Sequence, residues 1–452
     1  MRGQYVQHAF LIAASKISGL LGSLFFVYLM SPGDYGQYVI FLSVVSYLGV
    51  FNGLNFNQAY GRYIYESTKD INQRYFGGNI FLIIALSFIV TSTLSFMLII
   101  KLFALDISLI DFVALLVISF GISIEVILIQ DCVKKNALTV GIRYFLIRNI
   151  GYFLITVVLI RLGSSLSLIF QLEAVITLIG MCALFIHLNL AIKLKSLKYV
   201  LNYSMSYSLP LLPYSLALII LSQFDRLLIN KFYGSEITGY YSYIYNFGIL
   251  LSFMFSAYMN FVNNEFYRIC DSRDNETEFK NHQRSILYKF LLVCAVSAVL
   301  VTYLLGLLLT DEYLRVVPYF GIVVSAILLL SIWQIWARVL GYYKKTKVIG
   351  TVSFISAISG ALVLYALLAF KSAFHYGYWV TLLSYAILAI FGLLMVSKFN
   401  RGYVMPFKGD LKWIIIFILL NILSVYWNIL GPLMLIIFIL VLVSKKAHYL
   451  KF

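Results

Sequence analysis

The chain has 452 residues, of which 62% are apolar and only 12% are charged, and its formal net charge is +16. A soluble globular domain averages about 25% charged residues, so this chain has too little polar surface to cover a water-soluble particle. The composition excludes a cytosolic enzyme, a secreted domain and a disordered protein. It predicts an all-α polytopic membrane protein whose solvent is mostly lipid.

Apolar runs between charged breaks predict the helices in chain order, because a helix needs roughly 20 apolar residues to cross the bilayer core. The first half contains such runs at 9–30, 37–58, 79–100, 112–130, 144–160 and 167–190. The second half contains them at 206–230, 238–262, 288–309, 318–341, 348–370 and 376–397. The shorter runs 412–428 and 431–444 either span separately or form one re-entrant hairpin, so we expect 12–14 transmembrane helices.

An offset of 203 residues overlays the two halves, placing Gly36 on Gly239 and Asn57 on Asn260. Because six helices per half is an even number, equivalent helices run in the same direction, and the halves form parallel repeats around a central cleft. We therefore expect an N-terminal six-helix bundle over 1–203 and a C-terminal six-helix bundle over 204–405. A C-terminal helical hairpin with a basic tail follows over 406–452.

The distribution of cations predicts the orientation. With a cytoplasmic N-terminus, 27 of the 34 Lys and Arg residues lie on the inner side and 5 on the outer side. Such an excess is typical of cytoplasmic loops, so both termini are predicted to face the cytoplasm. The first apolar run is too long for a cleavable signal peptide. The longest polar loop, 263–285, is also placed inside, and short outer loops leave no room for a soluble catalytic domain.

Sequence motifs for catalysis and cofactors are absent. The chain has no G-x-x-x-x-G-K-[ST] loop for nucleotide phosphates, no H-E-x-x-H and no G-x-S-x-G. The four cysteines form no C-x-x-C pair, so no metal site is expected. The cations are spread over many loops rather than gathered on one face, which speaks against nucleic-acid binding. We predict a protein that is not an enzyme, with no cofactor, no metal and no bound nucleotide.

Two turns carry a family resemblance. The stretch 222–243 contains Asp225 and Arg226, then Gly234 and Gly239, while the stretch 31–38 holds a similar glycine-containing turn. These stretches resemble polysaccharide-export flippases of the multidrug/oligosaccharidyl-lipid/polysaccharide superfamily, and most of all the O-antigen translocases. The resemblance implies transport of undecaprenyl-pyrophosphate-linked O-antigen repeat units across the bacterial inner membrane by alternating access, as part of lipopolysaccharide biosynthesis. It also implies membrane lipid, a polysaccharide polymerase and a chain-length regulator as partners.

Charges inside the predicted spans suggest where a substrate binds, because burying one at the bilayer centre costs about 2.5–3.5 kcal/mol. A cationic cavity for the pyrophosphate would use five side chains. These are Lys16, Arg226, Arg148, Arg143 and Arg338. The alternatives are a structural ion pair for Lys16 and for Asp225–Arg226, and snorkelling to the lipid surface for the other three.

Other polar features of the spans suggest coupling and gating. Glu125, Glu173 and Asp225 are candidates for ion coupling, although each could instead neutralise a cation on a neighbouring helix. Pro210 and Pro213 predict a kink that either works as a gate or is static. The tyrosines near 240–245 form an interfacial belt or stack on sugar rings.

Three rival functions stay open. A cation-coupled multidrug exporter of the same superfamily would share the architecture. A flippase for another lipid-linked glycan, such as a capsule, teichoic-acid or peptidoglycan precursor, would share the mechanism. A polysaccharide polymerase or ligase would need a large outer loop, and the predicted topology contains none.

Overall fold

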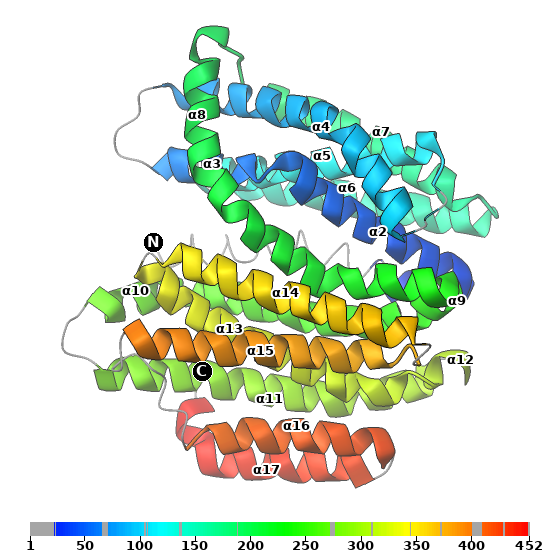
Figure 1. Ribbon diagram of the computed structural model, residues 1–452, viewed down its shortest axis with the longest axis vertical. Helices are drawn as coiled ribbons and strands as arrows, with labels where there is room; N and C mark the ends of the chain where they lie inside the picture. The colour runs from blue at the N-terminus through cyan, green and yellow to red at the C-terminus, as the bar shows by residue number, and fades with distance from the viewer. Residues whose placement is uncertain are drawn as a thin grey trace. The chain divides into compact units, whose positions relative to one another are not determined.

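The computed structural model describes residues 22–450, with gaps at 23, 66–70, 104, 106, 135–137, 188, 272–275, 309–310, 344, 371–372, 400–408 and 428–429. Every regular element in the described residues is helical (Figure 1). Ten of the described helices are long and apolar enough to cross a membrane. The all-α polytopic fold class is confirmed. The chain divides into two compact units, Met1–Gly239 and Tyr240–Phe452, whereas the boundaries predicted at 203 and 405 stay predictions.

The first unit consists of long helices that pack side by side. In chain order they are α2 (Pro32–Gly53), α3 (Phe56–Tyr65), α4 (Gln73–Phe103), α5 (Leu109–Lys134), α6 (Leu138–Arg161), α7 (Leu166–His187), α8 (Leu197–Ser208) and the first part of α9 (Leu212–Phe261). Helix α2 packs against α4 and α5, and α5 packs against α7. Helix α5 therefore has neighbours on several sides, which brings a polar residue on its buried face close to other helices.

Local sequence determines where these helices begin. Ser31 precedes α2, and its hydroxyl accepts a hydrogen bond from the Asp34 amide at 3.1 Å and donates one to the Asp34 carboxylate at 2.6 Å. Ser108 and Asp111 repeat this arrangement at the start of α5. The cap satisfies one of the backbone donors that each helix start leaves without an intrahelical acceptor.

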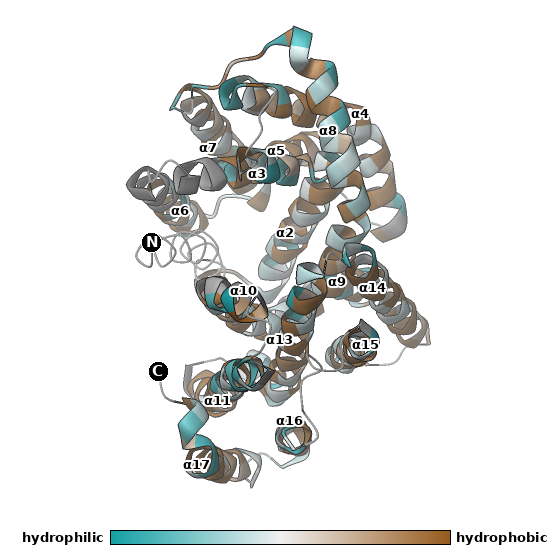
Figure 2. Ribbon diagram, turned by 90° about the vertical axis from the view of Figure 1, so that its left-hand side faces the viewer, coloured by the Kyte–Doolittle hydropathy of each residue, from teal (hydrophilic) through white to brown (hydrophobic). Residues whose placement is uncertain are grey.

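The second unit is arranged around one buried helix. Its elements are α10 (Asn263–Asp271), α11 (Glu276–Leu308), α12 (Asp311–Leu314), the 3-10 turn η3 (Val317–Tyr319), α13 (Phe320–Tyr342), α14 (Thr346–Ala369), α15 (Tyr376–Phe399), α16 (Leu411–Tyr426) and α17 (Leu430–Leu450). Helix α13 packs against α11, α14, α15 and α16, and it is the most buried of the described spans. Apolar residues dominate most helices, while hydrophilic residues gather at α8, at α10 and at helix ends (Figure 2).

The described helices follow most of the predicted spans, and the run 37–58 is interrupted between α2 and α3, where Leu54 and Asn55 have positive φ. The run 9–30 lies mostly outside the described residues. The run 206–230 begins in α8 and continues into α9, and the non-helical backbone of Gly234, with φ 83° and ψ 176°, divides α9 into two helices that correspond to the runs 206–230 and 238–262. The polar loop predicted at 263–285 is instead helical in its described parts, as α10 and the first turns of α11.

The predicted proline kink coincides with a change of helix type. Helix α8 ends at Ser208, the 3-10 turn η2 (Leu209–Leu211) contains Pro210, and Pro213 lies in the first turn of α9. Proline lacks the amide hydrogen that an α-helix interior requires, so the α-helical ladder is interrupted here. A gating role for this kink stays a prediction.

Candidate functional site

Three charged side chains from three neighbouring helices meet in the first unit. Arg148 on α6 donates through Nη1 to Glu125 Oε1 on α5, and its Nη2 lies 3.9 Å from Glu173 Oε1 on α7. The hydroxyl of Tyr144 donates to Glu125 Oε1 at 3.4 Å. Tyr144 and Arg148 are four residues apart on one helix, so both side chains point from the same face of α6. We call Glu125, Arg148 and Glu173 the charge cluster.

The charge cluster is well shielded from solvent, since 13% of the Arg148 side chain and 10% of each glutamate side chain are exposed. One guanidinium between two carboxylates leaves a formal charge of −1 when both acids are ionised. The two acids are not equivalent. Glu125 receives a direct bond from Arg148 and another from Tyr144, whereas Glu173 Oε2 is buried and has no hydrogen-bond partner among the described residues.

A neutral hydroxyl group lies beside the less engaged acid, and others lie on the same two helices. Tyr152 follows Arg148 by four residues on α6, and its hydroxyl lies beside Glu173. The hydroxyls of Tyr152 and Thr156, and of Thr177 on α7, are buried without a hydrogen-bond partner within the part of the chain that the structure describes. Buried polar atoms are normally satisfied by hydrogen bonds. These buried hydroxyls on α6 and α7 thus have spare hydrogen-bonding capacity, and that of Tyr152 lies beside Glu173.

Asp225 and Arg226 stay together on α9, and both are buried. The Asp225 carboxylate accepts a hydrogen bond from the Arg226 backbone amide at 2.8 Å, which partly satisfies it within its own helix. Next to this pair, Ser43 on α2 donates to Gln223 Oε1 at 2.9 Å. The pair therefore lies next to a contact between α9 and α2, and both roles considered for it stay predictions.

A close backbone contact joins α2 and α9 near the break at Gly234. A Cβ atom on Gly36 would lie 1.8 Å from the Ser235 carbonyl oxygen, and one on Gly239 would lie 2.2 Å from the Pro32 carbonyl oxygen. No residue with a side chain fits either position without a shift of the backbone. The overlay of the two halves treats Gly36 and Gly239 as equivalent positions. It gave no indication that the two glycines face each other.

The remaining predicted cations have different surroundings. Arg338 on α13 donates from Nη2 to the Met259 carbonyl oxygen at 2.6 Å, and its guanidinium lies 5.1 Å from the centre of the Phe266 ring. It therefore binds the last turn of α9 and the beginning of α10. Lys16 and the side chain of Arg143 lie outside the described residues. The structure brings Arg148 together with two predicted acids, and it leaves the substrate-binding role of all five cations as a prediction.

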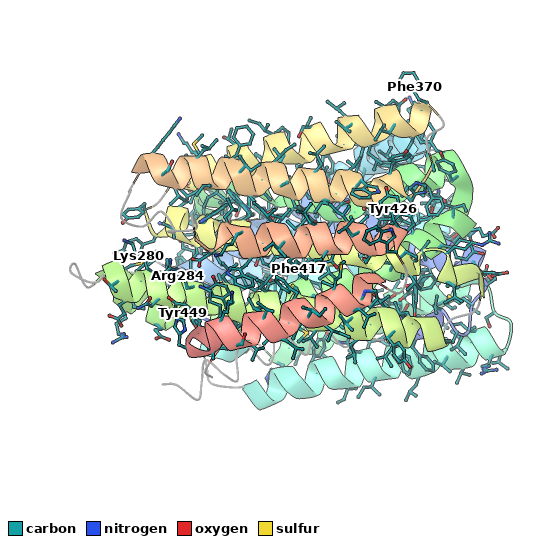
Figure 3. All side chains as sticks on the ribbon, turned by 90° about the horizontal axis from the view of Figure 1, so that it is seen from below. Lys280, Arg284, Phe370, Phe417, Tyr426 and Tyr449 are labelled. Atoms are coloured by element: carbon teal, nitrogen blue, oxygen red, sulfur yellow. The ribbon has the colours of Figure 1, made fainter. Side chains whose placement is uncertain are left out.

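A second charged group, which the sequence reasoning missed, attaches the C-terminal hairpin. Asp410 precedes α16 and is buried; its carboxylate accepts from Arg284 Nε at 2.7 Å and from the Tyr288 hydroxyl, and it lies 3.7 Å from Lys446 Nζ. Arg284 on α11 and Tyr449 on α17 lie close together at one end of the second unit (Figure 3). Asp410 is the only acidic residue in the sequence 406–452, and this isolation among basic residues could have indicated an ion pair. These side chains attach the start of α16 and the end of α17 to α11.

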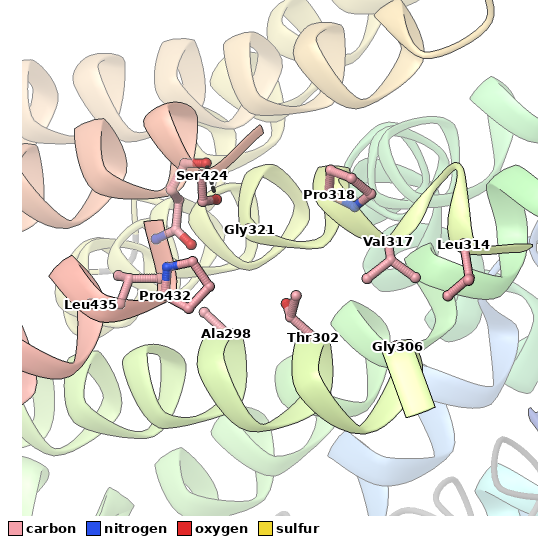
Figure 4. A pocket seen from close by; sticks show the side chains of 11 residues that line it. Ala298, Thr302, Gly306, Leu314, Val317, Pro318, Gly321, Ser424, Pro432 and Leu435 are labelled. Atoms are coloured by element: carbon pink, nitrogen blue, oxygen red, sulfur yellow. Dashed lines mark hydrogen bonds between the residues drawn. The ribbon is translucent and has the colours of Figure 1, made fainter. Parts of the chain in front are cut away.

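A cavity of about 240 Å³ opens in the second unit between α11, α13, α16 and α17 (Figure 4). Its lining is apolar or neutral, with Thr302, Ser424 and Asn421 as the polar members. Asn421 Oδ1 faces the backbone of Gly321, where a Cβ atom would lie 2.6 Å away. A lining without charges gives a phosphate group no partner, so this cavity is not the predicted cationic site.

The chain is similar to a protein family and to two solved structures. The family profile described as "Polysaccharide biosynthesis protein" matches residues 26–318. Among solved structures, a mutant of the MATE transporter VcmN from Vibrio cholerae superimposes with a TM-score of 0.58 at 15% identity, over 89% of this chain and 98% of that chain. A MOP superfamily transporter from Pyrococcus furiosus gives a TM-score of 0.44 at 12% identity, over 89% and 96%. No curated protein matches the chain significantly.

Proposed function

Because the chain belongs to the polysaccharide biosynthesis protein family, we propose that it is a flippase for a lipid-linked glycan. The proposed substrate is an undecaprenyl-pyrophosphate-linked O-antigen repeat unit. It moves from the cytoplasmic to the periplasmic leaflet of the bacterial inner membrane. Both termini of the protein lie in the cytoplasm in this proposal. A polysaccharide polymerase and a chain-length regulator act downstream, and the protein itself performs no covalent chemistry.

The physical problem that such a protein solves is the charge of the substrate. A pyrophosphate with several sugars would lose its hydration in the hydrocarbon core, and burial of an unpaired ion costs many kcal/mol. Alternating access avoids this step because the headgroup stays in a polar passage while the prenyl tail stays in lipid. The fold similarity to a MATE transporter supports an architecture suited to this cycle.

The observation that carries the proposal of ion coupling is the charge cluster. A buried ion pair seldom stabilises a protein more than well-packed apolar residues would. Ionisable residues within membrane spans commonly mark ion or substrate pathways. Arg148 and Tyr144 hold Glu125, while Glu173 keeps one oxygen without a hydrogen-bond partner among the described residues. We therefore assign the coupling proton or sodium ion to Glu173, with Glu125 and Asp225 as the other candidates.

The predicted cations divide into two groups in this proposal. Arg148 is engaged by carboxylates and Arg338 by a backbone carbonyl, so they act in positioning. Lys16, Arg143 and Arg226 are the proposed contacts for the pyrophosphate, because they are cations within the predicted spans. Arginine suits that task because its planar fork binds phosphate oxygens through two hydrogen bonds.

The experiment that tests the function is deletion of the gene, followed by measurement of lipid-linked sugars on each face of the inner membrane. We expect repeat units to accumulate on the cytoplasmic face and surface O-antigen to disappear, and plasmid-borne wild-type protein to reverse both effects. Normal surface glycan in the deletion strain would overturn the proposal. Accumulation of a capsule, teichoic-acid or peptidoglycan precursor instead would reassign the substrate.

Ion coupling has its own test in vesicles that contain the purified protein and the lipid-linked substrate. We expect Glu173→Gln to abolish the acceleration that an imposed proton or sodium gradient gives to flipping. Glu278 on α11 supplies the matched control, because its carboxylate is exposed and paired with Arg268 at 3.1 Å. Wild-type flipping that ignores both gradients, or a Glu173→Gln protein that still responds, would refute the coupling.

A cation-coupled multidrug exporter is the second candidate. The observation in its favour is the excess of carboxylate in the charge cluster, which suits a cationic ligand better than an anionic one. The two candidates differ in a direct measurement. A flippase for glycans predicts unchanged drug sensitivity in the deletion strain, whereas an exporter predicts increased sensitivity to cationic drugs with normal surface glycan.

A further inference from the structure

A series of stacked aromatic rings runs through one end of the second unit. Tyr241 on α9 stacks on Tyr378 of α15 with ring centres 4.4 Å apart and planes at 20°. Tyr378 stacks on Tyr319 at 5.4 Å and 19°, and Tyr319 stacks on His375 at 5.1 Å and 18°. His375 stacks on Tyr376 at 5.0 Å and 29°. We call these five rings the aromatic ladder.

The aromatic ladder leads from the interior to the surface. Tyr241 and Tyr378 are fully buried, and the Tyr378 hydroxyl donates to the Tyr241 carbonyl oxygen at 3.1 Å. Tyr319 and His375 are half-buried, and Tyr376 is 42% exposed. The inner rings are thus fixed by packing and a hydrogen bond. Each ring limits the rotation of the next, so the exposed ring of Tyr376 is held in one orientation before anything binds to it.

An interfacial aromatic belt does not require this arrangement. A belt residue needs an apolar body in lipid and a hydroxyl in the headgroup region, with freedom to adjust its rotamer. Tyr303 on α11 fits that description, since it is 68% exposed. Stacking five rings on one another costs side-chain entropy. An interfacial belt gains nothing from that loss. The stacking of these rings therefore indicates a ligand with a ring face, which benefits from an aromatic ring that is already held in one orientation.

The chemistry of the aromatic ladder indicates which ligand that is. Its members carry phenol hydroxyls and one imidazole. Burial lowers the pKa of His375, which keeps the imidazole neutral at pH 7. A neutral surface has no preference for phosphate. An aromatic face with polar atoms at its edge instead matches a sugar ring, which presents C–H bonds on its faces and hydroxyls around its rim.

The location agrees with this ligand. The predicted topology puts the loops that contain Tyr319 and His375 on the outer side of the membrane. The turn η3, which contains Tyr319, packs against α16, and Figure 3 shows Tyr426, the last residue of α16, at the opposite end of the second unit from Lys280 and Arg284, which the same topology places inside. A repeat unit that leaves the transporter emerges on the outer side, where its sugars can contact the aromatic ladder.

We propose that Tyr376 and His375, supported by the rest of the aromatic ladder, form a subsite that binds a sugar ring of the glycan as it emerges. The subsite rests on the proposed function for its substrate. Tyr376 contributes stacking and His375 contributes hydrogen bonds to the sugar, and neither takes part in binding pyrophosphate or coupling ions.

The test compares substitutions that separate the ring from its apolar area. Tyr376→Leu removes the ring and keeps much of the apolar surface, while Tyr376→Phe keeps the ring. A lost aromatic stack corresponds to about a three- to tenfold effect, so we expect Tyr376→Leu to slow the appearance of surface glycan in the complemented deletion strain by that factor. Tyr376→Phe and the matched control Tyr303→Leu should stay within about twofold of wild type at equal membrane abundance.

A binding measurement separates this proposal from the proposed function. The probe is the oligosaccharide released by mild acid from the lipid-linked pool, added to purified protein in nanodiscs. We expect saturation-transfer NMR signals on the sugar-ring protons, reduced at least threefold in Tyr376→Leu and kept in Tyr376→Phe. Equal signals in wild type and Tyr376→Leu, or none in wild type, would overturn the subsite. Failure of wild-type protein to restore surface glycan would overturn only the proposed function.

Discussion

Replacing Gly36 by alanine should push α2 away from α9 and destabilise the first unit. The added Cβ would lie 1.8 Å from the Ser235 carbonyl oxygen, whereas ordinary contacts begin at 3.4 Å, so the two backbones must separate by about 1.6 Å. The obstacle is backbone, which has no alternative rotamer. Overpacking of this kind costs about 1–3 kcal/mol. For a unit of this size we expect the midpoint of thermal unfolding to fall by roughly 2–12 °C.

The same helix turn supplies the control. A Cβ atom on Gly33 would have the Ser235 side-chain oxygen as its nearest neighbour, at 3.8 Å, which is an ordinary contact. Gly33→Ala should therefore change the midpoint by only a degree or two, since it adds no clash. The assay is thermal unfolding of the purified protein in detergent. An equal midpoint for Gly36→Ala and Gly33→Ala would refute the close approach of α2 and α9.

Two further substitutions test the buried charges. Arg148→Leu leaves Glu125 and Glu173 without their cation, so we expect the free energy of unfolding to fall by about 3–5 kcal/mol. Adding the two Glu→Gln changes should recover most of that loss, and additive effects in denaturant titrations would contradict the pairing. Asp410→Asn removes the negative charge that Arg284 and Lys446 face and replaces one of the two acceptor oxygens by an NH2 donor, so it should destabilise by about 1.5–3 kcal/mol. Lys412→Met, at a neighbouring exposed position, should have little effect in the same titration. Comparable losses in the two variants would show that Asp410 does not hold the hairpin.

The sequence alone determined the fold class and most helix positions. The predicted run 167–190 corresponds to α7, Leu166–His187, and the predicted run 348–370 corresponds to α14, Thr346–Ala369. The reason is local. A backbone in lipid must satisfy its hydrogen bonds within each segment, so a sufficiently long apolar run has no alternative to a helix. The glycine at 234 also has a local signature, because its positive φ is a conformation that residues with a Cβ rarely adopt.

Which charges meet depends on the packing of the helices. Nothing in the spacing of Glu125, Arg148 and Glu173 determines that α5, α6 and α7 bring them together, because pairing across helices depends on how each helix is rotated about its axis. The contact of Gly36 with Ser235 and the stacking of His375 on Tyr319 have the same origin. These arrangements depend on side-chain packing between residues far apart in the chain, which a pattern of apolar runs does not encode.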